Sequence, residues 1–221
     1  MIQGIIFDMD GVLVDNDQQH FKAFEIFCRR YGVADWRDKL AALFGMGNRD
    51  IMSQLLPPAV IAEKGFDALA DEKEAIYREI YAPTIAPGAG LHELLEGLAR
   101  RGVRCAVGSS GCVANVEFVL GSCGIGKYFD VRVTGDAVTR CKPDPEIYLP
   151  AAERLGLAPD RGLVFEVARA GIEAARRAGV RTVVALATTL TREELARTEA
   201  DVIIDDFRDL DDARLDALLN A

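Results

Sequence analysis

Apolar positions in the first third of the chain recur at the spacing of helices. Between residues 17 and 32 the intervals are three and four, which predicts an amphipathic helix that ends at Gly32. The apolar positions of that helix are Phe21, Phe24, Phe27, Cys28 and Tyr31. Two further helices are expected over Asp50–Leu56 and Asp67–Tyr81, each ending before a proline. Residues 15–83 therefore form one all-helical segment in this interpretation.

Beyond Pro87 the pattern changes to an alternation of short apolar runs and helical segments. Strands are expected at 4–7, 103–107, 131–134, 163–165, 182–186 and 202–204, and helices at 91–101, 113–123, 145–155, 171–178 and 192–198. Such alternation is typical of a parallel sheet with helices on both faces. The sequence thus predicts an α/β fold, in which a Rossmann-like parallel sheet core of residues 1–14 and 84–221 carries an inserted all-helical domain of residues 15–83.

Composition and charge narrow the class of protein. Half of the 221 residues are hydrophobic, which is enough for a sizeable core. The formal net charge of -9 gives no basic footprint, so nucleic acid is not an expected partner. No apolar stretch reaches the length of a membrane span, and the first residues lack the pattern of a signal peptide, so we expect a cytoplasmic protein without a membrane partner. The five scattered cysteines do not predict a zinc site.

Two acids follow the first strand in the string FDMDGVLVD, which covers residues 7–15. Because side chains alternate along a strand, Asp8 and Asp10 are expected to point to one site while Met9 packs the other way. A pair of carboxylates suits phosphoryl transfer, since one can attack phosphorus and the other can pass a proton. The alternative for the two acids alone is an ordinary polar loop after a strand.

Other polar loops are expected at the same edge of the sheet, where ligands bind in folds of this class. The run Gly108-Ser109-Ser110-Gly111 follows a strand and opens a helix, so Ser109 and Ser110 are candidates for cradling phosphate or for a plain helix cap. Lys142 lies in CKPDPEIY, where two prolines stiffen the loop, and its charge would offset that of a phosphoryl group.

These motifs together resemble the haloacid dehalogenase superfamily, in particular its phosphatase and beta-phosphoglucomutase-like branch. FDMDGVLVD looks like the first signature of the family, DxDGxxxD, and KPDPEIY is similar to the third. The resemblance implies that Asp8 is the nucleophile and Asp10 the general acid and base. It also implies that Ser109, Ser110 and Lys142 hold the phosphoryl group.

The fourth motif departs from the family pattern. VFEVARAGI is similar to a string in which a Glu-Asp pair precedes Ser, but Val167 and Ala168 stand where Asp and Ser are expected. Glu166 alone remains there as an acid. The resemblance implies a Mg²⁺ site formed by Asp8, Asp10 and Glu166, weakened by the change at Val167.

By the same resemblance the helical segment is a cap that selects the substrate, with His20, Arg49 and Lys73 at positions that contact sugar phosphate in the mutase branch. Cys112 replaces a lysine of the mutases, which lowers that possibility. The expected function is a Mg²⁺-dependent phosphatase of small phosphorylated metabolites, as a monomer or small homo-oligomer. A mutase-like phosphotransferase and a weakened metabolite-binding or regulatory protein stay open as alternatives.

Overall fold

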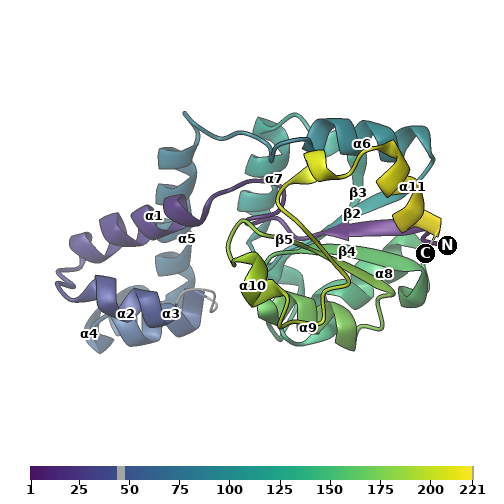
Figure 1. Cartoon of the computed structure of the whole chain (residues 1–221). Coiled ribbons are helices and arrows are strands. Elements are labelled where there is room, and N and C mark those ends of the chain that lie inside the picture. The colour runs from purple at the N-terminus through teal and green to yellow at the C-terminus, as the bar shows by residue number, and fades with distance from the viewer. Residues whose placement is uncertain (44–47, 221) are drawn as a thin grey trace. The chain divides into compact units, whose positions relative to one another are not determined.

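The computed structural model describes residues 1–43 and 48–220, and the chain divides into two compact units (Figure 1). One unit combines Met1–Asp15 with Ile85–Ala221, and the other is Asn16–Thr84. The boundaries expected from the sequence lie one residue away from these at each junction.

The first unit is built on a six-stranded sheet in which every neighbouring pair of strands is parallel. Its strands are β1 (Gly4–Phe7), β2 (Arg104–Gly108), β3 (Phe129–Val133), β4 (Gly162–Glu166), β5 (Thr182–Leu186) and β6 (Val202–Ile204). Their order is β3-β2-β1-β4-β5-β6, so β1 lies in the middle between β2 and β4. The predicted α/β fold with a Rossmann-like parallel sheet is confirmed.

Helices cover both faces of this sheet, as Figure 1 shows. They are α6 (Leu91–Arg100), α7 (Val113–Ser122), α8 (Tyr148–Leu155), α9 (Arg169–Arg177), α10 (Arg192–Leu195) and α11 (Asp212–Asn220). Tyr148 of α8 and Ile172 of α9 pack with Ile6 and Val164 of the sheet on one face. On the other face aromatic rings pack together, with Phe7 4.8 Å from Phe165 between ring centroids. The sheet is therefore buried on both sides, as its near-continuous apolar strands require.

The second unit consists of α1 (Asp17–Arg30), α2 (Trp36–Leu43), α3 (Asn48–Leu55), α4 (Pro58–Lys64) and α5 (Phe66–Tyr81). The two long helices, α1 and α5, pack against each other through their apolar stripes. Asn16 stands at the N-cap position of α1, but its side chain makes no cap bond there, and its Nδ2 donates to the Tyr77 hydroxyl, 2.7 Å away. Asn16 thus ties the start of α1 to α5.

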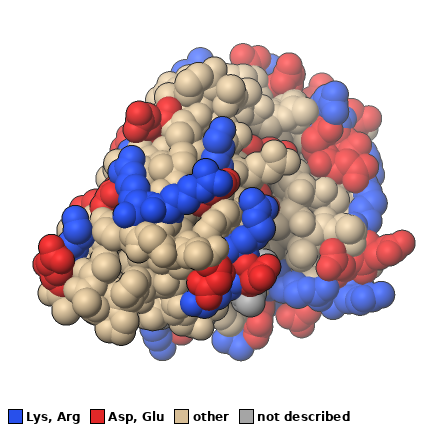
Figure 2. All heavy atoms as spheres, turned by 90° about the vertical axis from the view of Figure 1, so that its left-hand side faces the viewer, with Lys and Arg blue, Asp and Glu red and all other residues tan. Residues whose placement is uncertain are grey.

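Charged side chains of both signs are spread over the surface seen in Figure 2, with uncharged surface between them. Lys39 pairs with Asp35 at 2.8 Å, and Arg30 pairs with Glu72 at 3.1 Å. Exposed pairs of this kind contribute little to stability, so the α1–α5 core holds the unit together. Among residues 1–43 and 48–220, no helix has both the length and the apolar character needed to cross a bilayer.

Candidate active site

Three charged side chains meet in the first unit at the carboxyl ends of β1 and β4. Lys142 Nζ lies 2.9 Å from Asp8 Oδ1 and 2.6 Å from Glu166 Oε1. Asp8 directly follows β1, and Glu166 is the last residue of the neighbouring β4, so the sheet places the two acids side by side. The ammonium of Lys142 is therefore fixed between two carboxylates. This geometry agrees with the expectation that Lys142 and Asp8 lie at the same edge of the sheet.

Glu166 is fully buried and both of its carboxylate oxygens accept hydrogen bonds. Oε1 accepts from Lys142 and from the Tyr148 hydroxyl, each at 2.6 Å. Oε2 accepts from the backbone N–H groups of Val167 and Ala168 at 2.8 and 3.1 Å. A Cβ at Gly171 would lie only 1.7 Å from Oε1, so only glycine at this position leaves room for the carboxylate. The first turn of α9 is thus fitted around Glu166.

Asp8 and Glu166 both contact Lys142, but their pKa values are shifted in opposite directions. Burial opposes ionisation of Glu166, but Lys142 and the donors around it outweigh burial and lower the pKa of Glu166. Burial raises the pKa of Asp8 to about 7, an effect that the nearby charges of Glu166 and Asp10 reinforce and that Lys142 only partly offsets. Burial also works against charge on Lys142, yet Asp8 and Glu166 raise its pKa well above the usual value. Asp8 is consequently the acid poised to titrate near neutrality.

The loop that carries Lys142 is held by two acids of its own. Glu146 accepts hydrogen bonds from the backbone N–H groups of Thr139 and Arg140, both at 2.9 Å. Asp144 accepts from the N–H of Glu146 at 3.1 Å and caps the turn that begins at Pro145. These bonds fix the loop on both sides of Lys142. The acids of KPDPEIY thus act on the backbone of the loop, and its lysine enters the site.

The loop after β2 brings the predicted phosphate-binding serines to the same end of the sheet. Ser109 is fully buried, and its Oγ accepts a hydrogen bond from the N–H of Gly111 at 3.0 Å. A Cβ at Gly111 would lie 3.9 Å from Asp10 Oδ2, which places Asp10 beside this loop. Ser110 is exposed. At the start of α7 the carboxylate of Asp136 accepts from the N–H of Val113 at 2.7 Å, so an acid of the chain occupies part of that helix end.

The turn after the two acids depends on Gly11, whose φ of 74° suits glycine. A Cβ at Gly11 would lie 2.8 Å from Thr189 Oγ1 and 3.1 Å from Val167 Cγ2, so both side chains pack on the turn. Thr188 donates from its hydroxyl to the Gly11 carbonyl at 2.7 Å. The loop after β5 therefore supports the turn that carries Asp10.

The donors of this site fit a divalent cation only in part. Asp8 offers a carboxylate and Asp10 a backbone carbonyl in one loop, and such oxygen ligands suit Mg²⁺. Glu166 does not fit, because four hydrogen bonds already engage its two oxygens. Within the part of the chain that the structure describes, no group of three or more His, Cys, Asp or Glu is placed to hold a metal ion. A metal site with Asp8 and Asp10 stays a prediction.

His20 and Lys73, two of the three residues predicted to contact substrate, meet inside the helical unit. Lys73 Nζ lies 2.9 Å from His20 Nδ1 and 2.8 Å from Glu74 Oε1, and the His20 ring stacks on Tyr77. Lys73 is only 2% exposed, although a residue that contacts substrate is expected to be accessible. Its position four residues after the buried Leu69 places it on the core-facing side of α5, where Glu74 balances its charge.

Arg49, the third of these residues, is exposed and does not join the cluster around Lys73. Its guanidinium lies over the ring of Phe66, 4.6 Å from the ring centroid. The neighbouring Asn48 instead donates to Glu74 at 2.6 Å. Burial raises the pKa of Glu74, but the charges of Lys73 and His20 outweigh it, so the pKa is lowered and Glu74 stays ionised.

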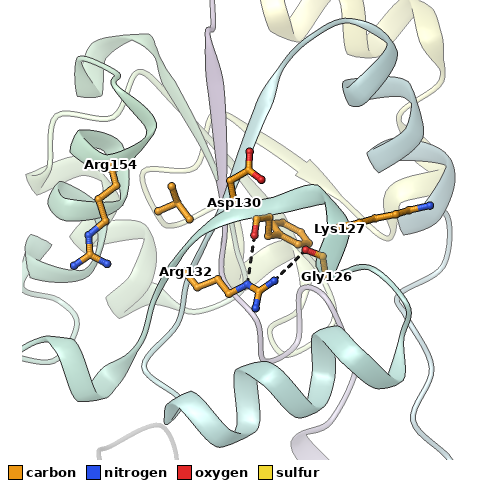
Figure 3. A pocket seen from close by; sticks show the side chains of 7 residues that line it. Gly126, Lys127, Asp130, Arg132 and Arg154 are labelled. Carbon is orange, nitrogen blue, oxygen red and sulfur yellow. Dashed lines mark hydrogen bonds between the residues drawn. The ribbon is translucent and has the colours of Figure 1, made fainter.

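A hollow of about 630 Å³ lies along β3 at the edge of the sheet (Figure 3). Its lining contains none of the residues predicted for catalysis and consists of Gly126, Lys127, Phe129, Asp130, Val131, Arg132 and Arg154. Arg132 donates to the carbonyls of Gly126 and Phe129 and forms two bonds with the Glu117 carboxylate. The guanidinium thus covers the open edge of β3 and is not offered to a ligand.

Comparison with known proteins identifies the family. Residues 5–185 match the family of haloacid dehalogenase-like hydrolases. The chain belongs to this family. It is 32% identical over 182 residues to the phosphorylated carbohydrates phosphatase of Thermotoga maritima, covering 81% of this chain and 82% of that protein. It is 34% identical over 210 residues to the validoxylamine A 7'-phosphate phosphatase of Streptomyces hygroscopicus, covering 95% and 96% of the two chains.

The fold of this chain is also similar to that of a solved structure. The crystal structure of CbbY from Rhodobacter sphaeroides in complex with phosphate superposes with a TM-score of 0.84 at 29% identity, over 98% of this chain and all of that one. The expectation of an enzyme of the haloacid dehalogenase superfamily is confirmed. Sequence reasoning assigned no role to Tyr148 and Gly171, although both lie in the quoted strings KPDPEIY and VFEVARAGI, and it missed Thr188, which supports the turn at Gly11.

Proposed function

We propose that this hydrolase removes phosphate from small phosphorylated metabolites, with phosphorylated sugars as the substrate class, through an aspartyl phosphate on Asp8. The observation that carries the proposal is the fixed Lys142 ammonium, 2.9 Å from the buried Asp8 carboxylate. A cation held at this place offsets the charge of a phosphoryl group as it approaches a negatively charged nucleophile. The phosphatases to which the chain is similar support the choice of substrate class.

In the proposed reaction Asp8 attacks phosphorus, and the bond between phosphorus and the ester oxygen of the substrate breaks. Asp10 gives its proton to that leaving oxygen, so the alcohol departs neutral. Asp10 then takes a proton from water, which attacks the phosphorus of the aspartyl phosphate and releases inorganic phosphate. Ser109, Ser110 and Lys142 hold the phosphoryl oxygens during both steps. Both carboxylates return to their starting protonation.

Mg²⁺ is the proposed cofactor, with Asp8 and Asp10 as its protein ligands. When bound, the cation would act as a Lewis acid on the phosphoryl oxygens. The role of the chain itself is to present Asp8 ionised, since a protonated carboxyl cannot attack. Lys142 favours the ionised form by partly offsetting the burial that raises the pKa of Asp8.

The helical unit, residues 16–84, is proposed to act as a cap that selects the substrate. Arg49 is the candidate for direct contact, because its guanidinium is exposed on the unit. Lys73 is buried against Glu74 and lies 2.9 Å from His20 Nδ1, and we propose that it fixes the partly exposed His20 ring for contact with the substrate. A closed cap would exclude water from the reacting phosphate.

A release assay tests the proposal. Purified protein is incubated with a panel of sugar phosphates and with phosphoglycolate, with and without Mg²⁺, and inorganic phosphate is measured. The expected result is turnover of at least one sugar phosphate that is lost in Asp8→Asn. Binding of these compounds without any phosphate release would show a weakened binding protein. Conversion of beta-glucose 1-phosphate into glucose 6-phosphate would show a mutase instead.

A further inference from the structure

We propose that the end of β4 and the loop after it supply no ligand to the metal. Glu166 is instead a positioning residue that holds Lys142. Val167 fills the position from which a further carboxylate would reach a metal held by Asp8 and Asp10. The proposal deepens the proposed function by assigning its cation site to one loop only, and it rests on that function for the location of the metal. Three sets of contacts carry it.

The hydrogen bonds of the Glu166 carboxylate are the first of these sets of contacts. Each carboxylate oxygen has two lone-pair directions, and Glu166 has two donors on each oxygen. Its side chain is fully buried, so a metal ion would have to displace Lys142, Tyr148 or two backbone N–H groups to reach it. Leaving such donors unpaired in a buried site is costly. The carboxylate is accordingly committed to the protein.

The surroundings of Gly171 and Tyr148 show that this arrangement is built into the fold. A Cβ on Gly171 would overlap Glu166 Oε1 at 1.7 Å, so the first turn of α9 carries the one residue that admits the carboxylate. Tyr148 is fully buried among apolar residues of α8 and the sheet, and its hydroxyl reaches Oε1 at 2.6 Å. Both features hold Glu166 toward Lys142. A carboxylate that served only as a metal ligand would need neither the space at Gly171 nor the Tyr148 hydroxyl.

The contacts of Val167 are the third set that supports the proposal. Its side chain is 4% exposed and packs on the turn after Asp10, where its Cγ2 lies 3.1 Å from the position of a Cβ on Gly11. A residue here faces the loop that carries Asp8 and Asp10. The position is thus suited to a third oxygen ligand but is filled by an apolar side chain. The Asp8 carboxylate, the Asp10 backbone carbonyl and water are left for a cation.

Calorimetric titration with MgCl₂, without substrate, tests the proposal on the full chain. The variants are Glu166→Gln, Val167→Asp and Val167→Asn, the last being a control of the same shape as Asp without its charge. We expect Glu166→Gln to change the Kd for Mg²⁺ by less than about twofold, whereas loss of a group that supports a metal typically costs about 10- to 100-fold. We expect Val167→Asp to tighten Mg²⁺ binding by about tenfold or more, and Val167→Asn to tighten it much less, because a neutral amide oxygen is a weaker ligand than a carboxylate.

Weakening of Mg²⁺ binding by tenfold or more in Glu166→Gln would overturn the proposal, as would a folded Val167→Asp protein with the affinity of the wild type. If Val167→Asp does not fold, Glu166→Gln decides alone, and if the wild type binds Mg²⁺ too weakly to measure, Val167→Asp decides. Phosphate release is assayed on the same preparations. A protein without turnover whose Val167→Asp variant gains Mg²⁺ affinity would refute the proposed function and leave this inference standing.

Discussion

Asp8 and Lys142 are the residues on which the account depends most. Asp8→Asn replaces the nucleophile with an amide of the same shape, which is a poor nucleophile and a weaker ligand for a cation. We expect phosphate release to fall to the background level. The melting temperature is the control, and it is expected to stay the same or rise, because a neutral amide removes a buried charge beside Glu166. Turnover close to that of the wild type would remove Asp8 from the mechanism.

The pH dependence of kcat/KM follows from the raised pKa of Asp8. The nucleophile must be ionised, so activity is expected to be full above the pKa of about 7 and to fall about tenfold per pH unit below it. Because Lys142 lowers the pKa of Asp8, Lys142→Met is expected to move this acidic limb to higher pH, besides reducing kcat/KM. A limb that stays in place in Lys142→Met would mean that another group controls it.

Lys73 shows how a single residue can be misread from a sequence. Taken alone it is a surface cation, but it lies four residues after Leu69 and four before Tyr77, on the buried stripe of α5. We expect Lys73→Met to destabilise the protein by about 3–5 kcal/mol in urea unfolding, because Glu74 would be left buried without its partner. The matched control is Arg49→Ala, whose exposed side chain is expected to affect KM for the substrate and hardly the stability. Equal stability of the two variants would contradict the buried pair.

At the scale of elements, the loop after β5 supports the turn of the first motif. Thr188→Val removes the hydroxyl that donates to Gly11 at 2.7 Å, and we expect kcat to fall about three- to tenfold, the size of one hydrogen bond, with little change in KM. Thr188→Ser, which keeps the hydroxyl, is expected to restore it. Thr198→Val is the control, because Thr198 donates to the Leu195 carbonyl in α10 and is expected to leave kcat unchanged. A rise in KM with unchanged kcat would instead indicate that Thr188 contacts the substrate.

The sequence predicted the strands β1 to β6 and most of the helices, and it missed α2, α4 and α11 for physical reasons. Strands such as β1 and β5 are apolar runs bounded by polar residues, and their limits agree with the prediction. The helices α2 and α4 have eight and seven residues, too few turns to establish a period, and α11 has only two buried residues. The break between Ile147 and Tyr148, where a 3₁₀ turn becomes α8, also leaves no signal in an apolar pattern.

At the scale of the whole molecule, the position of the site could be predicted from topology, and its bonding could not. Placing β1 between β2 and β4 brings together loops that are about 100 and 160 residues away from Asp8 in the sequence, as expected for a parallel sheet. The direction of the Glu166 side chain depends on the room left at Gly171 and on the Tyr148 hydroxyl, and the motif strings that contain these two residues do not reveal either contact. The family match supports the assignment of the loops, and the departure at Val167 is where this chain needs its own measurements.

The most direct test of the account is to trap the intermediate. The protein is mixed with a sugar phosphate that it hydrolyses, quenched in acid within the first turnover, digested and analysed by mass spectrometry. We expect the peptide that contains Asp8 to carry one added phosphoryl group in the wild type and none in Asp8→Asn. Phosphate release with no phosphorylated peptide, or with the phosphoryl group on a residue other than Asp8, would contradict the account.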